Sequence, residues 1–218
     1  FDEMPNAKES KLLQVVIQKK GERFLNKLEL FNYFPLVWEE GDLISITADA
    51  NHFQKSFSIK NPSTSNAEML RLRDIKIESF NKHLALNGID DHDESRIIKR
   101  AEVLLDFQKP LMKFANESSE LFPALVAIRW VSIEGDYERV PELLFNQCEK
   151  WKENFPNYPF VNQLCEKGSL KILPVMIGDM IPDFPMPMLS GEEVPLKSMI
   201  SKKLTVIDLW ASWCAPCR

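Results

Sequence analysis

The chain has 218 residues, of which 44% are hydrophobic and 27% are charged, an ordinary composition for a globular protein of one large domain or two smaller ones. Lys and Arg total 27 against 32 Asp and Glu, for a net charge of −5, and the basic residues form no stripe. This balance argues against nucleic acid as a partner, and no apolar run is long enough for a transmembrane segment. With 7 glycines, 3 histidines and 4 cysteines, the chain has little material for a phosphate loop or a multi-ligand metal site, so we expect no cofactor and no metal.

The first sixty residues are predicted to form an antiparallel sheet with one solvated face. Residues 12–18 are a compact apolar run that ends at a turn. Residues 34–38 and 43–48 flank a short turn, which predicts a hairpin. Residues 24–30 fit a strand and a helix almost equally well. One more strand is predicted from Phe53, Phe57 and Ile59.

Apolar residues recur at helical spacing in five segments between residues 63 and 174, which predicts a helical module. The faces expected to be buried, in chain order, are Leu70, Ile77, Phe80 and Leu84; Ile97, Ala101, Leu104, Gln108 and Leu111; Phe122, Val126, Trp130 and Ile133; Leu144, Cys148 and Trp151; and Val161, Leu164 and Cys165.

Caps and breaks of these helices are predicted from single residues. Ser65 and Glu68 have the spacing of a capping box at the start of the first helix. Pro110 is expected to kink or interrupt the second helix, because it lacks a backbone donor. Ser118 or Ser119 is expected to cap the third helix.

Cys148 and Cys165 lie on the apolar faces of the fourth and fifth predicted helices. Single buried cysteines of this kind are usually inert core thiols, and this is our first expectation. A disulfide between them is the alternative if the two helices pack antiparallel.

The pattern with the clearest chemistry is Cys214-Ala-Pro-Cys217, which directly follows a β-rich apolar run at residues 204–209 that predicts a buried strand. A cysteine at the start of a helix meets unpaired amides that stabilise its thiolate, and the thiolate is the form that attacks a disulfide. A second thiol three residues later lies one helical turn away and can release the reduced substrate. Pro216 fits the first helical turn, where its missing N–H has no cost.

Other uses of the cysteine pair are less consistent with the sequence. A zinc ribbon needs a second close Cys or His pair, whereas Cys148 and Cys165 stand singly. Covalent haem attachment needs His after the second cysteine, and position 218 is Arg. A peroxidase of the peroxiredoxin type would want Thr or Ser at 211 and Pro at 207, where the chain has Ala and Ile.

Residues 206–218, Val-Ile-Asp-Leu-Trp-Ala-Ser-Trp-Cys-Ala-Pro-Cys-Arg, resemble the active-site strand and helix start of thioredoxin-like thiol–disulfide oxidoreductases. Residues 177–184, with Gly191 and Leu196, look like the lead-in hairpin of the TlpA/ResA branch, which is related to the AhpC/TSA group. Residues 34–66 are similar to the accessory β-domain that often precedes such modules in bacterial cell-envelope proteins.

Together the patterns and the resemblance imply an α+β protein. The expected organisation is an antiparallel β accessory domain, incomplete at its N-terminus, over residues 1–62, a helical module over residues 63–174, and the start of a thioredoxin-like α/β domain over residues 175–218. The remainder of that last domain would follow Arg218, so we expect this chain to be a truncated piece of a longer protein and to be inactive by itself.

The resemblance also implies roles for single residues. Cys214 would be the attacking thiol and Cys217 the resolving thiol of a redox disulfide. Asp208 aligns with the buried carboxylate that accepts the proton of the resolving thiol; a solvated residue at the end of a strand is the alternative. Trp210 and Trp213 would pack beside the site, although ordinary core packing explains them equally well.

The resemblance implies partners and a compartment as well. The expected partners are protein thiol or disulfide substrates and an upstream electron donor, and the expected location is the periplasm or cell envelope. The Ala-Pro dipeptide between the cysteines resembles that of reducing members. A different interpretation is an interaction module that binds an envelope partner, with the redox unit as an accessory.

Overall fold

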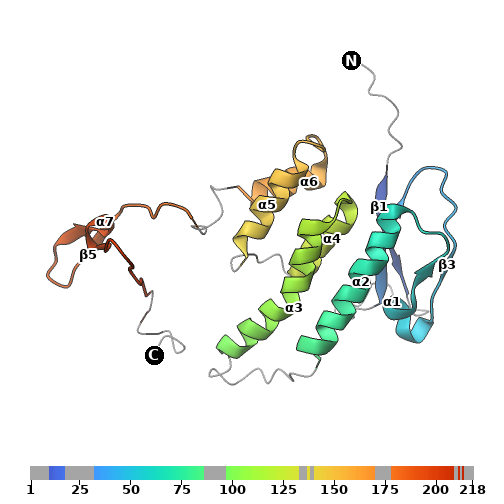
Figure 1. Ribbon diagram of the computed structural model, residues 1–218, viewed down its shortest axis with the longest axis horizontal. Helices are drawn as coiled ribbons and strands as arrows, with labels where there is room; N and C mark the ends of the chain where they lie inside the picture. The colour runs from blue at the N-terminus through green and yellow to red at the C-terminus, as the bar shows by residue number, and fades with distance from the viewer. Residues whose placement is uncertain are drawn as a thin grey trace, which may run out of the picture.

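The structure is a computed structural model that describes residues 10–17, 32–85, 97–132, 137, 140–169, 178–208, 211 and 213. Its fold is α+β, with short antiparallel strand pairs at the N-terminal end and a set of longer helices after them (Figure 1). Within these residues no helix is both long and apolar enough to cross a membrane. Residues 24–30, whose sequence fits a strand and a helix almost equally well, lie outside the described residues.

The principal strand pair differs from the predicted one. β1 (Lys11–Val16) pairs antiparallel with β2 (Tyr33–Trp38), and the predicted hairpin between residues 34–38 and 43–48 is wrong. The turn after β2 does form, since the Asp42 N–H donates to the Glu39 carbonyl over 3.0 Å. The chain then leaves the sheet, because the second edge of β2 is already covered by helices.

A side chain of the first long helix provides that cover. The Val37 N–H donates to Asn66 Oδ1 over 2.9 Å, and Asn66 Nδ2 donates to the Val37 carbonyl over 2.8 Å. The amide of Asn66 thus replaces a neighbouring strand, which satisfies the buried backbone groups of β2. Nearby, Gln54 Nε2 donates to the Tyr33 carbonyl over 2.7 Å.

The predicted strand through Phe53, Phe57 and Ile59 is mostly helical. A 3₁₀ turn η1 (Ala50–His52) and the short helix α1 (Phe53–Ser56) precede β4 (Ser58–Ile59), which pairs with β3 (Ile46–Thr47). Asp49 Oδ1 accepts the Asn51 N–H over 2.9 Å and caps this turn, so the chain coils before it extends.

Five helices confirm the helical module. They are α2 (Thr64–His83), α3 (Ile97–Glu117), α4 (Leu121–Val131), α5 (Pro141–Trp151) and α6 (Pro159–Lys167). Helices α2, α3 and α4 lie side by side, and β2 packs against α2 (Figure 1). The buried apolar residues of the strands and of the helices belong to one core cluster, whereas the domain boundaries remain predictions.

The caps of two helices lie at other residues than predicted. Ser63, not Ser65, is the N-cap of α2, because its Oγ accepts the Asn66 N–H over 3.3 Å. The N-cap of α4 is Glu120, whose own N–H donates to Ser118 Oγ over 3.2 Å. Pro110 does not interrupt α3, which continues to Glu117.

The buried face of α2 is rotated from the predicted one. The predicted residues Leu70, Ile77, Phe80 and Leu84 are only half-buried. The fully buried positions are Asn66, Met69, Leu72, Arg73, Lys76 and Ser79. The displacement is one residue, about 100° around the helix, and it arises because polar residues occupy half of the buried face. In α3, Leu104 is likewise 41% exposed against the expectation, while Leu111 is fully buried.

The described C-terminal segment contains a small hairpin and one helical turn. β5 (Pro185–Pro187) pairs antiparallel with β6 (Glu193–Pro195), and α7 (Leu196–Met199) follows directly. Gly191, expected in a hairpin, lies in the connecting turn: the Met188 N–H donates to the Glu192 carbonyl over 2.8 Å, and Gly191 has φ +84°, which glycine adopts without strain.

Candidate functional site

Only part of the predicted redox site falls within the described residues. Asp208 is exposed to solvent, and the Trp213 side chain is 85% exposed. The alternative for Asp208, a solvated residue at a strand end, agrees with this exposure better than a buried carboxylate does. The other predicted site residues lie outside the described residues: Trp210, Cys214, Pro216 and Cys217.

The strand predicted before the dithiol is not buried. Residues 204–208 are extended but belong to no strand pair in the described part of the chain, and Leu204 and Val206 are 78% and 83% exposed. A tight turn begins the segment, where Ser201 Oγ accepts the Leu204 N–H over 3.1 Å and the Ser201 N–H donates to Thr205 Oγ1 over 2.8 Å. The prediction of a buried strand is therefore wrong for the described residues, because no neighbouring strand or helix covers it there.

The hairpin that precedes this segment is held to α7 by two hydrogen bonds. The Leu196 N–H donates to the Phe184 carbonyl over 3.0 Å, and the Lys197 N–H donates to Asp183 Oδ1 over 3.0 Å. Leu196 is buried. These contacts fix the start of the chain that leads toward Cys214.

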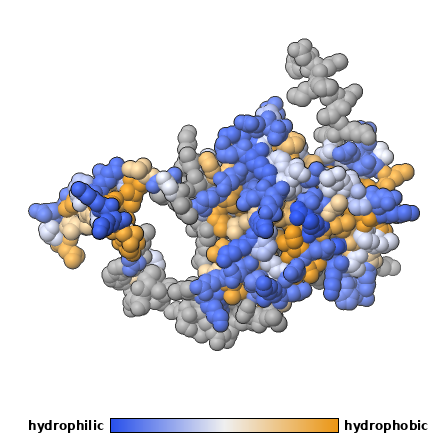
Figure 2. All heavy atoms as spheres, viewed as in Figure 1, coloured by the Kyte–Doolittle hydropathy of each residue, from blue (hydrophilic) through white to orange (hydrophobic). Residues whose placement is uncertain are grey.

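Large apolar side chains are exposed along the whole C-terminal segment. Figure 2 shows orange surface on this part of the molecule, outside the helices. Monomeric proteins rarely leave so much apolar surface in contact with water, so the segment has the composition of an interior element without its cover. The exposed residues are Met180, Phe184, Met188, Leu189, Met199, Leu204, Val206, Ile207 and Trp213.

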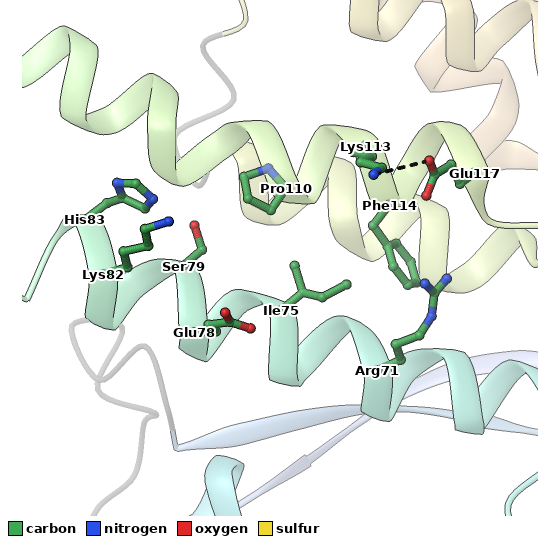
Figure 3. A pocket seen from close by; sticks show the side chains of 10 residues that line it. All are labelled: Arg71, Ile75, Glu78, Ser79, Lys82, His83, Pro110, Lys113, Phe114 and Glu117. Atoms are coloured by element: carbon green, nitrogen blue, oxygen red, sulfur yellow. Dashed lines mark ion pairs between the residues drawn. The ribbon is translucent and has the colours of Figure 1, made fainter.

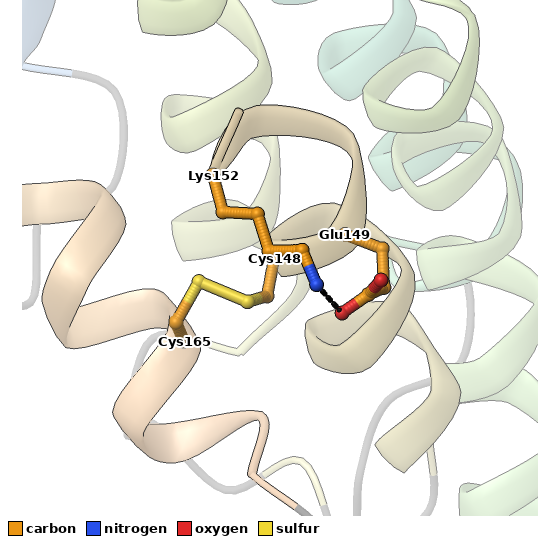
Figure 4. Close-up of a disulfide and its surroundings, with 4 residues drawn as sticks. All are labelled: Cys148, Glu149, Lys152 and Cys165. Atoms are coloured by element: carbon orange, nitrogen blue, oxygen red, sulfur yellow. Dashed lines mark hydrogen bonds and ion pairs between the residues drawn. A yellow bond between two sulfur atoms is a disulfide. The ribbon is translucent and has the colours of Figure 1, made fainter. Parts of the chain in front are cut away.

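A disulfide joins Cys148 of α5 to Cys165 of α6, with a Cα–Cα distance of 4.8 Å (Figure 4). The expectation of two inert thiols is thus wrong, and the alternative is confirmed. Cys148 is buried, whereas Cys165 is half-buried. The sequence signal for the pairing was the position of both cysteines on the apolar faces of two consecutive helices, but the spacing alone cannot give their relative orientation.

Gly168 allows the two helices to approach closely near the disulfide. A Cβ at this position would lie 2.8 Å from the Leu144 carbonyl oxygen. Leu144 lies one turn before Cys148 on α5, and Gly168 lies one turn after Cys165 at the end of α6. The close contact and the disulfide therefore join the same two helices at positions about one helical turn apart.

A buried amine lies in the core between β2, α1, α2 and α4. Lys76 Nζ donates to Gln54 Oε1 over 3.1 Å and lies 4.5 Å from the centre of the Trp130 ring. Burial lowers the pKa of Lys76 to about 7. Beside it, Trp130 Nε1 donates to Tyr33 Oη over 2.6 Å, and burial raises the pKa of Tyr33. No sequence pattern indicated this cluster, since lysine in a helix is normally solvated.

A surface pocket of about 290 Å³ lies between α2 and α3 (Figure 3). Four of its polar side chains have partners: Ser79 Oγ donates to the Phe107 carbonyl over 2.9 Å, Arg71 pairs with Glu68 over 2.7 Å, and Lys113 lies 3.8 Å from Glu117. Asp208 and Trp213, the predicted site residues that the structure describes, do not line it. The lining residues are Arg71, Ile75, Glu78, Ser79, Lys82, His83, Pro110, Lys113, Phe114 and Glu117.

Comparison with known proteins gives one link to a family. A stretch of 55 residues is 40% identical to the thioredoxin-like protein YneN of Bacillus subtilis (strain 168). The match spans 25% of this chain and 32% of that protein, so the chain covers about a third of the length of this relative. No family model matches the chain, and no solved structure matches it. Part of the chain is therefore similar to a thioredoxin-like protein.

Proposed function

We propose that this chain belongs to a thiol–disulfide oxidoreductase of the thioredoxin-like type that acts through Cys214 and Cys217. The Cys-Ala-Pro-Cys sequence after an apolar, β-branched segment carries the proposal, because it places two thiols one helical turn apart. The 40% identity of 55 residues to a thioredoxin-like protein supports it.

In the proposed reaction the Cys214 thiolate attacks a substrate disulfide and forms a mixed disulfide. Cys217 then loses its proton and attacks Cys214, which releases the substrate as a dithiol. Asp208 would accept the Cys217 proton. That role requires Asp208 to be covered when the complete site assembles, since burial is what raises a carboxyl pKa toward neutrality.

The exposed apolar residues of the C-terminal segment are an argument that the dithiol belongs to a larger domain. The chain covers 32% of the thioredoxin-like relative, and we propose the activity for the protein in which further strands and helices cover residues 204–208. Under this proposal the chain by itself lacks a substrate groove and is inactive.

We further propose that the protein is a TlpA/ResA-type reductant of proteins in the periplasm or cell envelope. Disulfides persist mainly in oxidising compartments, so the Cys148–Cys165 disulfide supports this location. The Ala-Pro dipeptide between Cys214 and Cys217 is consistent with a reducing enzyme.

Reduction of insulin by the full-length protein with a dithiol donor tests the proposal. Cys214→Ser should lower the rate to that of the donor alone, while Lys203→Gln, an exposed change in the same segment, should leave it unaltered. In parallel, alkylation against pH should give Cys214 an apparent pKa below the free value of about 8.5. Equal insulin reduction by the wild type and Cys214→Ser would contradict the proposal.

A further inference from the structure

The strand pair β1–β2 is covered along one edge and open along the other. In β2, both backbone groups of Val37 bond to the side chain of Asn66, and the Tyr33 carbonyl accepts from Gln54 Nε2. Strand β1 has no strand neighbour other than β2 among the described residues. The second edge of β1 therefore presents a row of backbone donors and acceptors that fits another extended chain.

The register of the pair identifies the residues of this open edge. In an antiparallel pair, residues that exchange backbone hydrogen bonds alternate with residues whose backbone groups point away from the partner strand. The Ile17 N–H donates to the Asn32 carbonyl over 3.1 Å. Counted from this bond along the register, Leu12, Gln14 and Val16 direct their N–H and carbonyl groups to the open edge.

The side chains of β1 lack the features that usually protect an edge strand. The strand reads Lys-Leu-Leu-Gln-Val-Val, without proline and with one charge, at its first residue. Leu13 is 42% exposed and Val16 is 36% exposed, and the two side chains project from opposite faces of the strand. Proteins protect an open edge with proline, inward charges or a short strand, so an apolar edge of six residues indicates a surface that pairs.

The sequence of β1 is complementary to itself in the antiparallel direction. When Gln14 lies opposite Gln14 of a second copy, the other central positions pair apolar side chains with apolar side chains, which stabilises a sheet. The charge of Lys11 falls at the end of the paired region, opposite Ile17, so it meets no like charge. The central cross-strand pairs are Leu12 with Val16, Leu13 with Val15, and Gln14 with Gln14.

We propose that β1 is a dimerisation edge, at which β1 of one copy pairs antiparallel with β1 of a second copy about a two-fold axis at Gln14. The result is a four-stranded sheet in the order β2–β1–β1–β2, and a sheet of this size is more stable than a pair of strands. Because Asn66 and Gln54 cover the outer edge of β2, the sheet ends there and the assembly stops at two copies. The pairing is independent of the proposed reaction of the dithiol.

A cross-link at the two-fold axis tests the geometry in the full-length protein. Residues opposite each other in a hydrogen-bonded antiparallel pair have Cα atoms about 5.5 Å apart, within the range that a disulfide spans. Gln14→Cys should therefore give a disulfide-linked dimer on mild oxidation, and peptide mapping should place the bond between the two substituted positions. The variants also carry Cys214→Ser and Cys217→Ser, so that the proposed redox thiols do not reduce the link.

The matched control for the cross-link lies on the same strand. Lys11 is exposed like Gln14, but the two copies of residue 11 lie at opposite ends of the paired region, about 20 Å apart. Lys11→Cys in the same background should give no linked dimer. Equal linking at both positions would overturn the proposed register and the two-fold axis with it.

Removal of one backbone donor tests the edge itself. Gln14 lies opposite Pro35 of β2 in a pair that exchanges no hydrogen bonds, so Gln14→Pro leaves the β1–β2 bonds intact. It removes one N–H from the centre of the open edge in each copy, and thus two hydrogen bonds per dimer. The dissociation constant of the dimer should rise about tenfold or more, whereas Gln14→Thr, which keeps the N–H, should leave it nearly unchanged.

Sedimentation velocity over a range of concentrations measures the dissociation constants. Two strands of six residues give a small interface, and interfaces below about 1,200 Å² are typical of weak complexes, so the wild type should dissociate on dilution. A full-length protein that stays monomeric at every concentration and forms no link at position 14 overturns the inference. A dimer that forms no such link and is insensitive to Gln14→Pro also overturns it, because that dimer uses another surface.

Discussion

Two regions of the molecule differ in how far their apolar side chains are buried. One is the body, the strands and helices within residues 32–169, and the other is the segment at residues 178–208. In the body, Phe34, Phe57, Phe114 and other large residues are almost completely buried in one cluster. Among residues 178–208, Leu196 is the one buried apolar side chain, whereas Leu189 is as exposed as in an extended peptide and Val206 is 83% exposed.

The contrast shows where the free energy of folding lies. Burial of apolar surface is the principal driving force, at about 25 cal/mol per Å². The body has this driving force within the described residues, whereas the C-terminal segment has turns and a hairpin but almost no core. We therefore expect mutations in the body to change the stability of this chain, and mutations in the segment to change only what the segment assembles with.

The largest effect is expected for a core aromatic residue. Phe34 is fully buried and stacks on Phe57 with a ring-centre distance of 4.1 Å, so Phe34→Ala should lower the free energy of unfolding by about 3–5 kcal/mol. Leu189→Ala in the exposed turn is the matched control and should change it by less than about 0.5 kcal/mol. Urea denaturation measures both, and similar effects of the two substitutions would contradict the contrast.

The next effect is expected from opening the disulfide. Cys148→Ala with Cys165→Ala should cost about 3 kcal/mol by the loop-closure argument, yet leave the helical circular dichroism signal at low temperature unchanged. The reason is that Leu144, Val161 and Leu164 stay buried. Complete loss of helical structure in the double variant would show that the bond, not the core, holds α5 and α6 together.

A smaller effect, visible as a pH dependence, is expected from Lys76. Its pKa is about 7 in the folded protein, against the ordinary lysine value of 10.5 that applies to the unfolded chain, so above pH 7 the unfolded state binds more protons. Stability should therefore rise with pH, by at most about 1.4 kcal/mol per pH unit between about pH 7 and the unfolded pKa, and by at most about 2 kcal/mol up to about pH 8.5.

Lys76→Met should remove this rise, because it replaces the amine by an apolar group of similar length. Lys109→Met is the control, since the Lys109 side chain is 60% exposed and forms a surface ion pair with Asp106. Urea denaturation at several pH values measures both variants. An unchanged slope in Lys76→Met would assign the pH dependence to other groups.

These cases also explain which parts of the molecule could be predicted from the sequence. The helices, with Val126, Trp130 and Leu164 buried, follow from apolar periodicity, and the turn at 190–192 follows from its glycine. The pairing of β1 with β2 could not be predicted, because it depends on Asn66 of α2 as a substitute strand. Apolar periodicity also predicted the buried face of α2 one residue away from its observed position. The reason is that Lys76 is buried through a hydrogen bond to Gln54, which a pattern of apolar residues cannot indicate.

For the candidate site, the sequence supplied the chemistry and the structure supplied its surroundings. The dithiol spacing is a local property and can be predicted from Cys214 and Cys217 alone. The exposure of Asp208 is a non-local property, because it depends on which elements cover residues 204–208. The disulfide was recognisable only as an alternative, since it requires the relative placement of α5 and α6.

The smallest effect on this chain, and the sharpest test of the contrast, concerns the exposed segment. Val206→Gln should change the free energy of unfolding of the chain by less than about 0.5 kcal/mol, because the side chain is 83% exposed. Under the proposed function, the same substitution in the full-length protein should destabilise the proposed redox domain and lower the rate of insulin reduction, because an uncompensated polar group would then enter a sheet interior. Lys203→Gln should be neutral in both settings. Wild-type activity of full-length Val206→Gln would mean that the segment stays in contact with water and that its apolar surface serves a partner outside the domain.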